Sequence, residues 1–142
     1  MVSFSTIKSH TTGDSSHRLA VMWVCNGGTS TTDASPQAWN NPSTSGYTWI
    51  GFSGASPWLI EYIKPNQLYK HWLVFFYYYA LNGSDSVQDA LNDAARQVGY
   101  SDFASSPLGS GSYSTYWLYS PSGSYSGQMR ALGDPSGTYL PS

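Results

Sequence analysis

The residue whose chemistry is most distinctive in this chain is Cys25, its only cysteine. A thiol becomes a nucleophile when it ionises, which requires partial exposure and a nearby base, usually a histidine. Cys25 directly follows the apolar run LAVMWV and precedes Asn26, Gly27 and Gly28. These glycines would leave room for a substrate backbone and free amide groups to stabilise an oxyanion. The alternative is that Cys25 is a small buried hydrophobic residue at a strand end.

Three histidines are candidates for the base, and their positions separate them. His17 directly precedes the run that Cys25 ends, so a strand of that length would hold the two about 25 Å apart. His71 falls in an apolar segment and is expected to make one hydrogen bond in or near the core. His10 is the remaining candidate base, because it follows a weakly alternating segment and can reach the same sheet edge.

Other kinds of site find little support in the residues. One cysteine excludes an internal disulfide framework and a multi-cysteine zinc site, and no two histidines have metal-ligand spacing on a helix face. Carboxylates are dispersed, so no pair suggests glycoside hydrolysis. The six lysines and arginines are scattered, which argues against a nucleic-acid partner. We therefore expect no metal, no cofactor and no nucleic acid.

Charged residues are scarce, at 10 %, whereas the aromatic fraction is 16 %. Because about a quarter of the residues in an ordinary soluble domain are charged, copies of this chain would repel one another little. The composition therefore favours an extracellular or cell-surface protein that packs against copies of itself. The abundant tryptophans and tyrosines also allow carbohydrate binding, although core and subunit contacts are their commoner uses. The longest apolar stretch is shorter than the roughly 20 residues of a membrane span, so membrane insertion is not expected.

The elements that would position Cys25 begin with two strands and a helix. The run over 19–24 has no alternation, which is typical of a strand covered on both faces in a parallel sheet. YTWIGF over 47–52 is a second strand, rich in aromatic and β-branched residues. The segment 67–81 is apolar nearly all round and predicts a buried helix, with a strand over VFFYYY as the alternative.

A second helix is indicated by its start and stop signals. Ser86 followed by Asp89 resembles a capping box, and Gly99 marks the end. Apolar residues fall at helical spacing between them: Val87, Ala90, Leu91, Ala94, Ala95 and Val98. Further short elements are expected at 112–119 and 125–132.

This order of elements predicts a single α/β domain over 1–142, with a small, mostly parallel sheet flanked by helices. Residues 1–18 are a polar N-terminal segment that can supply an edge strand. Residues 19–100 form the α/β core, and 101–142 are a Ser/Gly/Tyr-rich C-terminal segment.

Four stretches, taken in order, resemble one family. LAVMWVCNGG, YTWIGFSGASP, FYYYALNGSDSVQDALNDA and ALGDPSGTYLP are similar to the cysteine-bearing half of the caspase-like cysteine peptidases, which include the legumains, clostripains and gingipains. The resemblance covers roughly 18–140. It implies part of a caspase-like fold, Cys25 as the nucleophile and a peptide as the substrate. The binding residues that it implies are Asn26, Gly27, Gly28, Trp49, Ser53 and Ser56.

In that family the catalytic histidine ends the preceding parallel strand, in a His-Gly pair. His10 is followed by Thr11, and fourteen residues separate it from Cys25. A parallel crossover alone needs about a dozen residues or more, so we expect the histidine-bearing strand to be absent from this chain. Two hypotheses follow. The chain is a cysteine-peptidase-like domain that is incomplete or inactive alone, or it is a non-catalytic extracellular building block that self-assembles.

Overall fold

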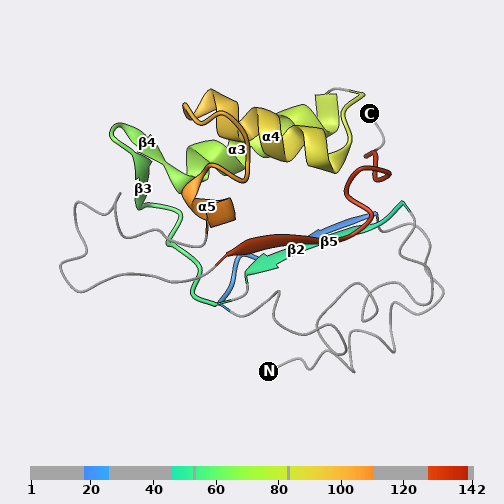
Figure 1. Cartoon of the computed structure of the whole chain (residues 1–142), viewed down its shortest axis with the longest axis horizontal. Helices are drawn as coiled ribbons and strands as arrows, with labels where there is room; N and C mark the ends of the chain where they lie inside the picture. The colour runs from blue at the N-terminus through green and yellow to red at the C-terminus, as the bar shows by residue number, and fades with distance from the viewer. Residues whose placement is uncertain (1–17, 26–45, 53, 83, 111–127, 141–142) are drawn as a thin grey trace.

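The computed structural model describes residues 18–25, 46–52, 54–82, 84–110 and 128–140 (Figure 1). Within these ranges, β1 (Leu19–Val21), β2 (Thr48–Phe52) and β5 (Met129–Gly133) form one sheet in the order β1-β2-β5. A second, two-stranded sheet pairs β3 (Tyr62–Lys64) with β4 (Gln67–Leu68). The helices are α3 (Tyr69–Asn82), α4 (Val87–Gln97) and α5 (Pro107–Ser110). Figure 1 shows α3 and α4 side by side over one face of the three-stranded sheet.

The three-stranded sheet is mixed, so the prediction of a mostly parallel sheet is wrong. β1 runs parallel to β2, with Leu19 opposite Thr48, whereas β5 runs antiparallel to β2, with Gly133 opposite Thr48. The antiparallel partner comes from the C-terminal segment, whose direction the local sequence pattern does not encode. The broader α/β class is confirmed by the mixture of sheet and covering helices.

β1 is shorter and less buried than its apolar run predicts. It spans Leu19–Val21 instead of 19–24, and each of its residues is half-buried. The amide of Met22 extends the pairing by one residue, donating to the Ile50 carbonyl at 2.8 Å. Since none of its side chains is fully buried, the expected burial on both faces does not occur.

The core lies between β2 and the two helices. All five residues of β2 are buried, and Ile50 and Phe52 belong to the cluster that packs against the helices. The buried side chains of α3 are Tyr69, Trp72, Phe76 and Ala80. Those of α4 are Val87, Ala90, Leu91, Ala94 and Ala95. This interlayer cluster holds the sheet in place beneath α3 and α4.

The helix expected over 67–81 is present with two differences. It begins at Tyr69, because Gln67 and Leu68 form β4, and VFFYYY is helical, which excludes the strand alternative. The expectation of burial on all sides is wrong, because the face opposite the core is exposed, at Val74 and Tyr78 among others. An apolar composition alone does not identify which face of a helix meets the core.

The predicted boundaries of α4 are confirmed by its caps. The hydroxyl of Ser86 accepts the Asp89 amide at 3.1 Å and itself donates to the Asp89 carboxylate at 2.7 Å. At the other end, Gly99 has φ +88°, a left-handed conformation that glycine adopts at little cost. The amides of Gly99 and Tyr100 then donate to the Arg96 and Ala95 carbonyls, the pattern of a Schellman motif.

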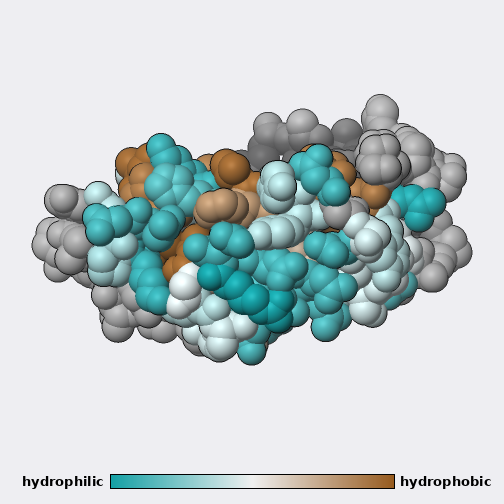
Figure 2. Space-filling model, turned by 90° about the horizontal axis from the view of Figure 1, so that it is seen from above, coloured by the Kyte–Doolittle hydropathy of each residue, from teal (hydrophilic) through white to brown (hydrophobic). Residues whose placement is uncertain are grey.

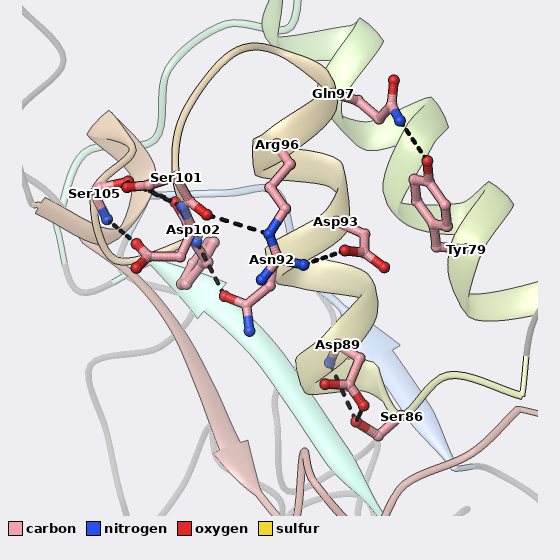
Figure 3. A network of polar contacts seen from close by, with 11 residues as sticks. Tyr79, Ser86, Asp89, Asn92, Asp93, Arg96, Gln97, Ser101, Asp102 and Ser105 are labelled. Carbon is pink, nitrogen blue, oxygen red and sulfur yellow. Dashed lines mark hydrogen bonds and ion pairs between the residues drawn. The ribbon is translucent and has the colours of Figure 1, made fainter.

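Polar contacts extend outward from α4 (Figure 3). Asn92 accepts the backbone amide of Phe103 at 3.1 Å, and Arg96 donates to the Ser101 carbonyl at 3.2 Å. Arg96 also pairs with Asp93, one turn earlier. These contacts fold the segment that follows α4 back along the helix.

A turn over 134–138 joins the sheet to the start of α4. The Asp134 amide donates to the Tyr47 carbonyl at 2.8 Å, and the Asp134 carboxylate accepts the Gly46 amide at 2.9 Å. The first amide of α4, that of Val87, donates to the Thr138 carbonyl at 2.9 Å. The next amide, that of Gln88, donates to the Pro135 carbonyl at 3.0 Å, so the Gly-Asp-Pro segment near the end of the sequence has a structural role in satisfying the helix N-terminus.

Two predicted features lie outside the described residues. They are the edge strand in 1–18 and the element at 112–119. The element expected at 125–132 corresponds in part to β5, which spans Met129–Gly133.

Candidate functional site

Cys25 and Ser56 meet just beyond the carboxyl ends of β1 and β2. Because these strands are parallel, the segments that follow them leave the sheet at the same edge, which is where open α/β sheets bind ligands. The Ser56 amide donates to the Cys25 sulfur at 3.4 Å. The Ser56 hydroxyl oxygen lies 3.6 Å from the same sulfur. One serine thus presents two polar groups to the thiol.

The two partners differ in exposure. Cys25 is a free, exposed thiol, whereas Ser56 is 8 % exposed. Packing therefore holds the donor in place while the sulfur stays open to reagents. The alternative that Cys25 is a buried hydrophobic residue is wrong, because β1 ends at Val21, four residues before Cys25, and the thiol is exposed.

The hydrogen bonds from Ser56 favour the ionised form of the thiol. The Ser56 backbone amide makes the largest contribution, and its hydroxyl the next, to a pKa of Cys25 below the usual thiol value. Partial burial acts in the opposite direction but is outweighed. A lower pKa raises the fraction of thiolate at neutral pH, and the thiolate is the nucleophilic form.

Trp23 fixes the two segments relative to each other. Its indole Nε1 donates to the Pro57 carbonyl at 2.7 Å, next to Ser56. Its ring packs edge-on against Phe52, with centroids 5.1 Å apart, and lies 6.1 Å from the ring of Trp72. The residue two before the thiol is thus anchored both in the core and to the segment that carries Ser56.

The substrate-binding residues implied by the family resemblance are placed in different ways. Ser56 contacts Cys25, as described. Trp49, the second residue of β2, is fully buried and lies opposite Ala20 and Leu132 in the register, so a ligand does not reach its side chain. The candidate base and the remaining binding residues lie outside the described residues: His10, Asn26, Gly27, Gly28 and Ser53.

His71 has the kind of environment expected for it. It lies half-buried in the first turn of α3, where its Nδ1 accepts the Leu68 amide at 3.1 Å. This bond joins the end of β4 to the start of the helix. His71 therefore has a local structural role.

Sequence reasoning missed the anchoring by Trp23 and the hydrogen bonding of Ser56 to the thiol. The register of β1 and β2, extended beyond the strands, brings Cys25 opposite Gly54, two residues before Ser56. A prediction that paired the two strands would have placed Cys25 near Ser56. The Trp23 anchor depends on the three-dimensional path of the chain after Phe52, and no local pattern indicates it.

Acidic, histidine and cysteine side chains do not gather into a cluster that could hold a metal ion anywhere in the ranges that the structure describes. In the same ranges, no helix combines the length and the apolar character that crossing a membrane requires. Comparison of the chain with protein-family models, with curated proteins and with solved structures finds no match.

Proposed function

We propose that this chain is the nucleophile-bearing part of a cysteine-peptidase-like domain, with Cys25 as the nucleophile and a peptide as the substrate. The observation that carries the proposal is the hydrogen bond from the buried Ser56 amide to the exposed sulfur. It supports a thiolate at neutral pH, located at the sheet edge where α/β proteins bind their ligands.

The chemistry would follow the two steps of covalent acyl transfer. The thiolate of Cys25 adds to the carbonyl carbon of a peptide bond and forms a tetrahedral oxyanion. Collapse of this intermediate breaks the C–N bond, and the amine leaves with a proton from the general acid. Water, deprotonated by the same group acting as a base, then hydrolyses the thioester, which releases the carboxylic acid and restores the thiolate and the protonated group.

The acid–base group must come from outside the described residues. His10 is the candidate within the chain, and a histidine from a second polypeptide is the alternative. Ser56 would keep the sulfur ionised and oriented before attack, because a hydrogen-bonded thiolate needs less help from a neighbouring base.

The test is covalent capture by a peptide-based electrophile. Incubation with a panel of peptidyl acyloxymethyl ketones, followed by mass spectrometry, should give one adduct per chain, located at Cys25. Cys25→Ala removes the sulfur and is the matched control, which should give no adduct. Wild-type protein that reacts with every member of the panel no faster than free cysteine at the same pH would contradict the proposal.

A second variant identifies the base. If His10 supplies it, His10→Ala should slow adduct formation at neutral pH and leave it unchanged at alkaline pH, where the thiol ionises without help. An unchanged rate at both pH values would assign the base to another polypeptide.

A further inference from the structure

An exposed apolar stripe runs along α3, on the face away from the core. It consists of Val74, Tyr77, Tyr78 and Leu81, which are 65 %, 38 %, 58 % and 45 % exposed. We refer to these four residues as the α3 stripe. Their spacing of three and four residues places them on one side of the helix. The same spacing forms one side of a seam between two packed helices.

A groove lies beside the α3 stripe, toward α4. Its volume is about 310 Å³, and its lining residues are Val74, Phe75, Tyr78, Tyr79 and Gln97. The Gln97 amide donates to the Tyr79 hydroxyl at 2.6 Å and links the two helices at this point (Figure 3). Viewed from the side of the helices, the surface shows hydrophobic patches among hydrophilic residues (Figure 2). The α3 stripe forms a ridge and the groove lies next to it, and helices pack by fitting the ridges of one helix into the grooves of the other.

The charges of α3 point to another copy of the same helix as the partner. Lys70 lies in its first turn, where a positive charge opposes the helix dipole. The first turn carries no acidic residue and the last turn no basic one, so neither end of the dipole is compensated within the helix. Antiparallel pairing of two copies would set each helix start beside the other copy's helix end, and each Lys70 beside the carbonyl end that attracts it.

The register of such a pair follows from the α3 stripe. A two-fold axis between Tyr77 and Tyr78 sets Val74 opposite Leu81 of the second copy. Because α3 ends at Asn82, the same axis sets Lys70, which is exposed, just beyond the helix end of the second copy, where the turn that leads to α4 carries Asp85. Each end of the apolar seam therefore has Lys70 of one copy next to the turn of the other copy that carries a carboxylate.

We infer that this chain forms a two-fold homodimer in which the α3 stripes of two copies pack antiparallel, with Lys70 of each copy facing Asp85 of the other. The low charge of the whole chain, at 10 %, reduces repulsion between the copies. The inference goes beyond the proposed thiol chemistry and does not depend on it.

The apolar part of the seam is tested by two matched lysine substitutions. Val74 and Ile60 are both β-branched and are 65 % and 68 % exposed, but only Val74 belongs to the α3 stripe. In sedimentation equilibrium, Val74→Lys should weaken dimerisation by about tenfold or more, because it buries an ammonium group at the seam. Ile60→Lys should dimerise as the wild type does. A monomeric wild type at its solubility limit, or equal effects of the two substitutions, would overturn the inference.

The antiparallel register is tested by charge reversal. Lys70→Glu and Asp85→Lys should each weaken the dimer, and the double variant should restore it toward the wild-type constant, because the pair is then reversed. Failure of the double variant to recover would overturn the register. Cys25→Ala should leave the dimer constant unchanged, so loss of the thiol chemistry and loss of the dimer are separate results.

Discussion

The backbone amide of Ser56 donates to the sulfur of Cys25 across 3.4 Å, although the two residues are 31 positions apart in the chain. They meet because β1 and β2 run parallel, with Val21 opposite Ile50, so that the segments that follow the two strands begin at the same edge of the sheet. The donor is buried and the thiol is exposed. The arrangement stabilises negative charge on an accessible atom, which is what a nucleophilic cysteine requires.

The anchoring of this pair by Trp23 predicts that a small change at the indole will alter the reactivity of the thiol. Trp23→Phe removes the hydrogen bond to the Pro57 carbonyl but keeps an aromatic ring beside Phe52. We expect a loss of about 1 kcal/mol in the free energy of unfolding and a slower reaction of Cys25 with iodoacetamide at neutral pH.

Trp58→Phe is the matched control, because Trp58 is 65 % exposed and lies in the segment that carries Ser56 and Pro57. It should change neither quantity. A Trp23→Phe variant that is destabilised but alkylated at the wild-type rate would show that the indole supports the fold and not the thiol.

Gly133 ends β5 where the chain passes close to β2. Its φ is +99°, and a Cβ atom there would lie 2.4 Å from the Tyr47 carbonyl oxygen, which belongs to the neighbouring backbone. Gly133→Ala should therefore reduce the free energy of unfolding by more than about 3 kcal/mol, measured by urea denaturation.

Gly46→Ala separates the cost of a positive φ from the cost of a steric clash at the added Cβ atom. Gly46 also has a positive φ, of +68°, but a Cβ atom there would meet nothing closer than 3.6 Å, the guanidinium of Arg18. We expect a cost of about 1–2 kcal/mol from the left-handed conformation alone. Equal costs at the two glycines would contradict the close approach of β5 to Tyr47.

The buried hydroxyl pair of Thr48 and Thr138 links β2 to the turn that caps α4. Thr48 donates to Thr138 at 2.8 Å, and Thr138 donates to the Asp134 carbonyl at 2.6 Å. Thr138→Val should cost about 1–3 kcal/mol, because it leaves the Thr48 hydroxyl without its acceptor. The double variant Thr48→Val/Thr138→Val should cost less than the sum of the two single variants. Additive costs in this double-mutant cycle would mean that the two hydroxyls do not interact.

Parts of this fold depend on signals between residues close together in the sequence, and these parts could be predicted. The start of α4 depends on Ser86 and its end on Gly99, and both signals act over only a few residues, so the predicted boundaries agree with the structure. The strand before Cys25 could be predicted only in part, because the apolar run extends to Val24 whereas β1 ends at Val21.

Other parts depend on contacts between distant segments and could not be predicted. The antiparallel pairing of β5 with β2 joins residues about 80 positions apart, and no local pattern sets its direction. The exposed face of α3 carries apolar residues like those of its buried face, so composition did not separate them. The role of Ser56 emerged only when the register of β1 and β2 brought it to Cys25.

The pH dependence of Cys25 alkylation tests the central claim most directly. The chain has one cysteine, so iodoacetamide reports on that thiol alone. Because Ser56 lowers the pKa of Cys25, the wild-type rate should rise with pH around a midpoint below that of an ordinary thiol.

The lowered pKa of Cys25 also makes the free energy of unfolding depend on pH. The stabilisation from these hydrogen bonds is fully present above the pKa of the thiol in the unfolded chain, and it is lost as the pH falls through the pKa of the thiol in the folded chain.

In the same measurement, Ser56→Ala should move the midpoint part of the way toward that of an ordinary thiol, because it removes the hydroxyl but keeps the backbone donor. Ser84→Ala, at an exposed serine between α3 and α4, should leave the midpoint unchanged. The account predicts a low wild-type midpoint that rises only in the Ser56 variant. A wild-type midpoint at the ordinary thiol value, insensitive to Ser56→Ala, would contradict it.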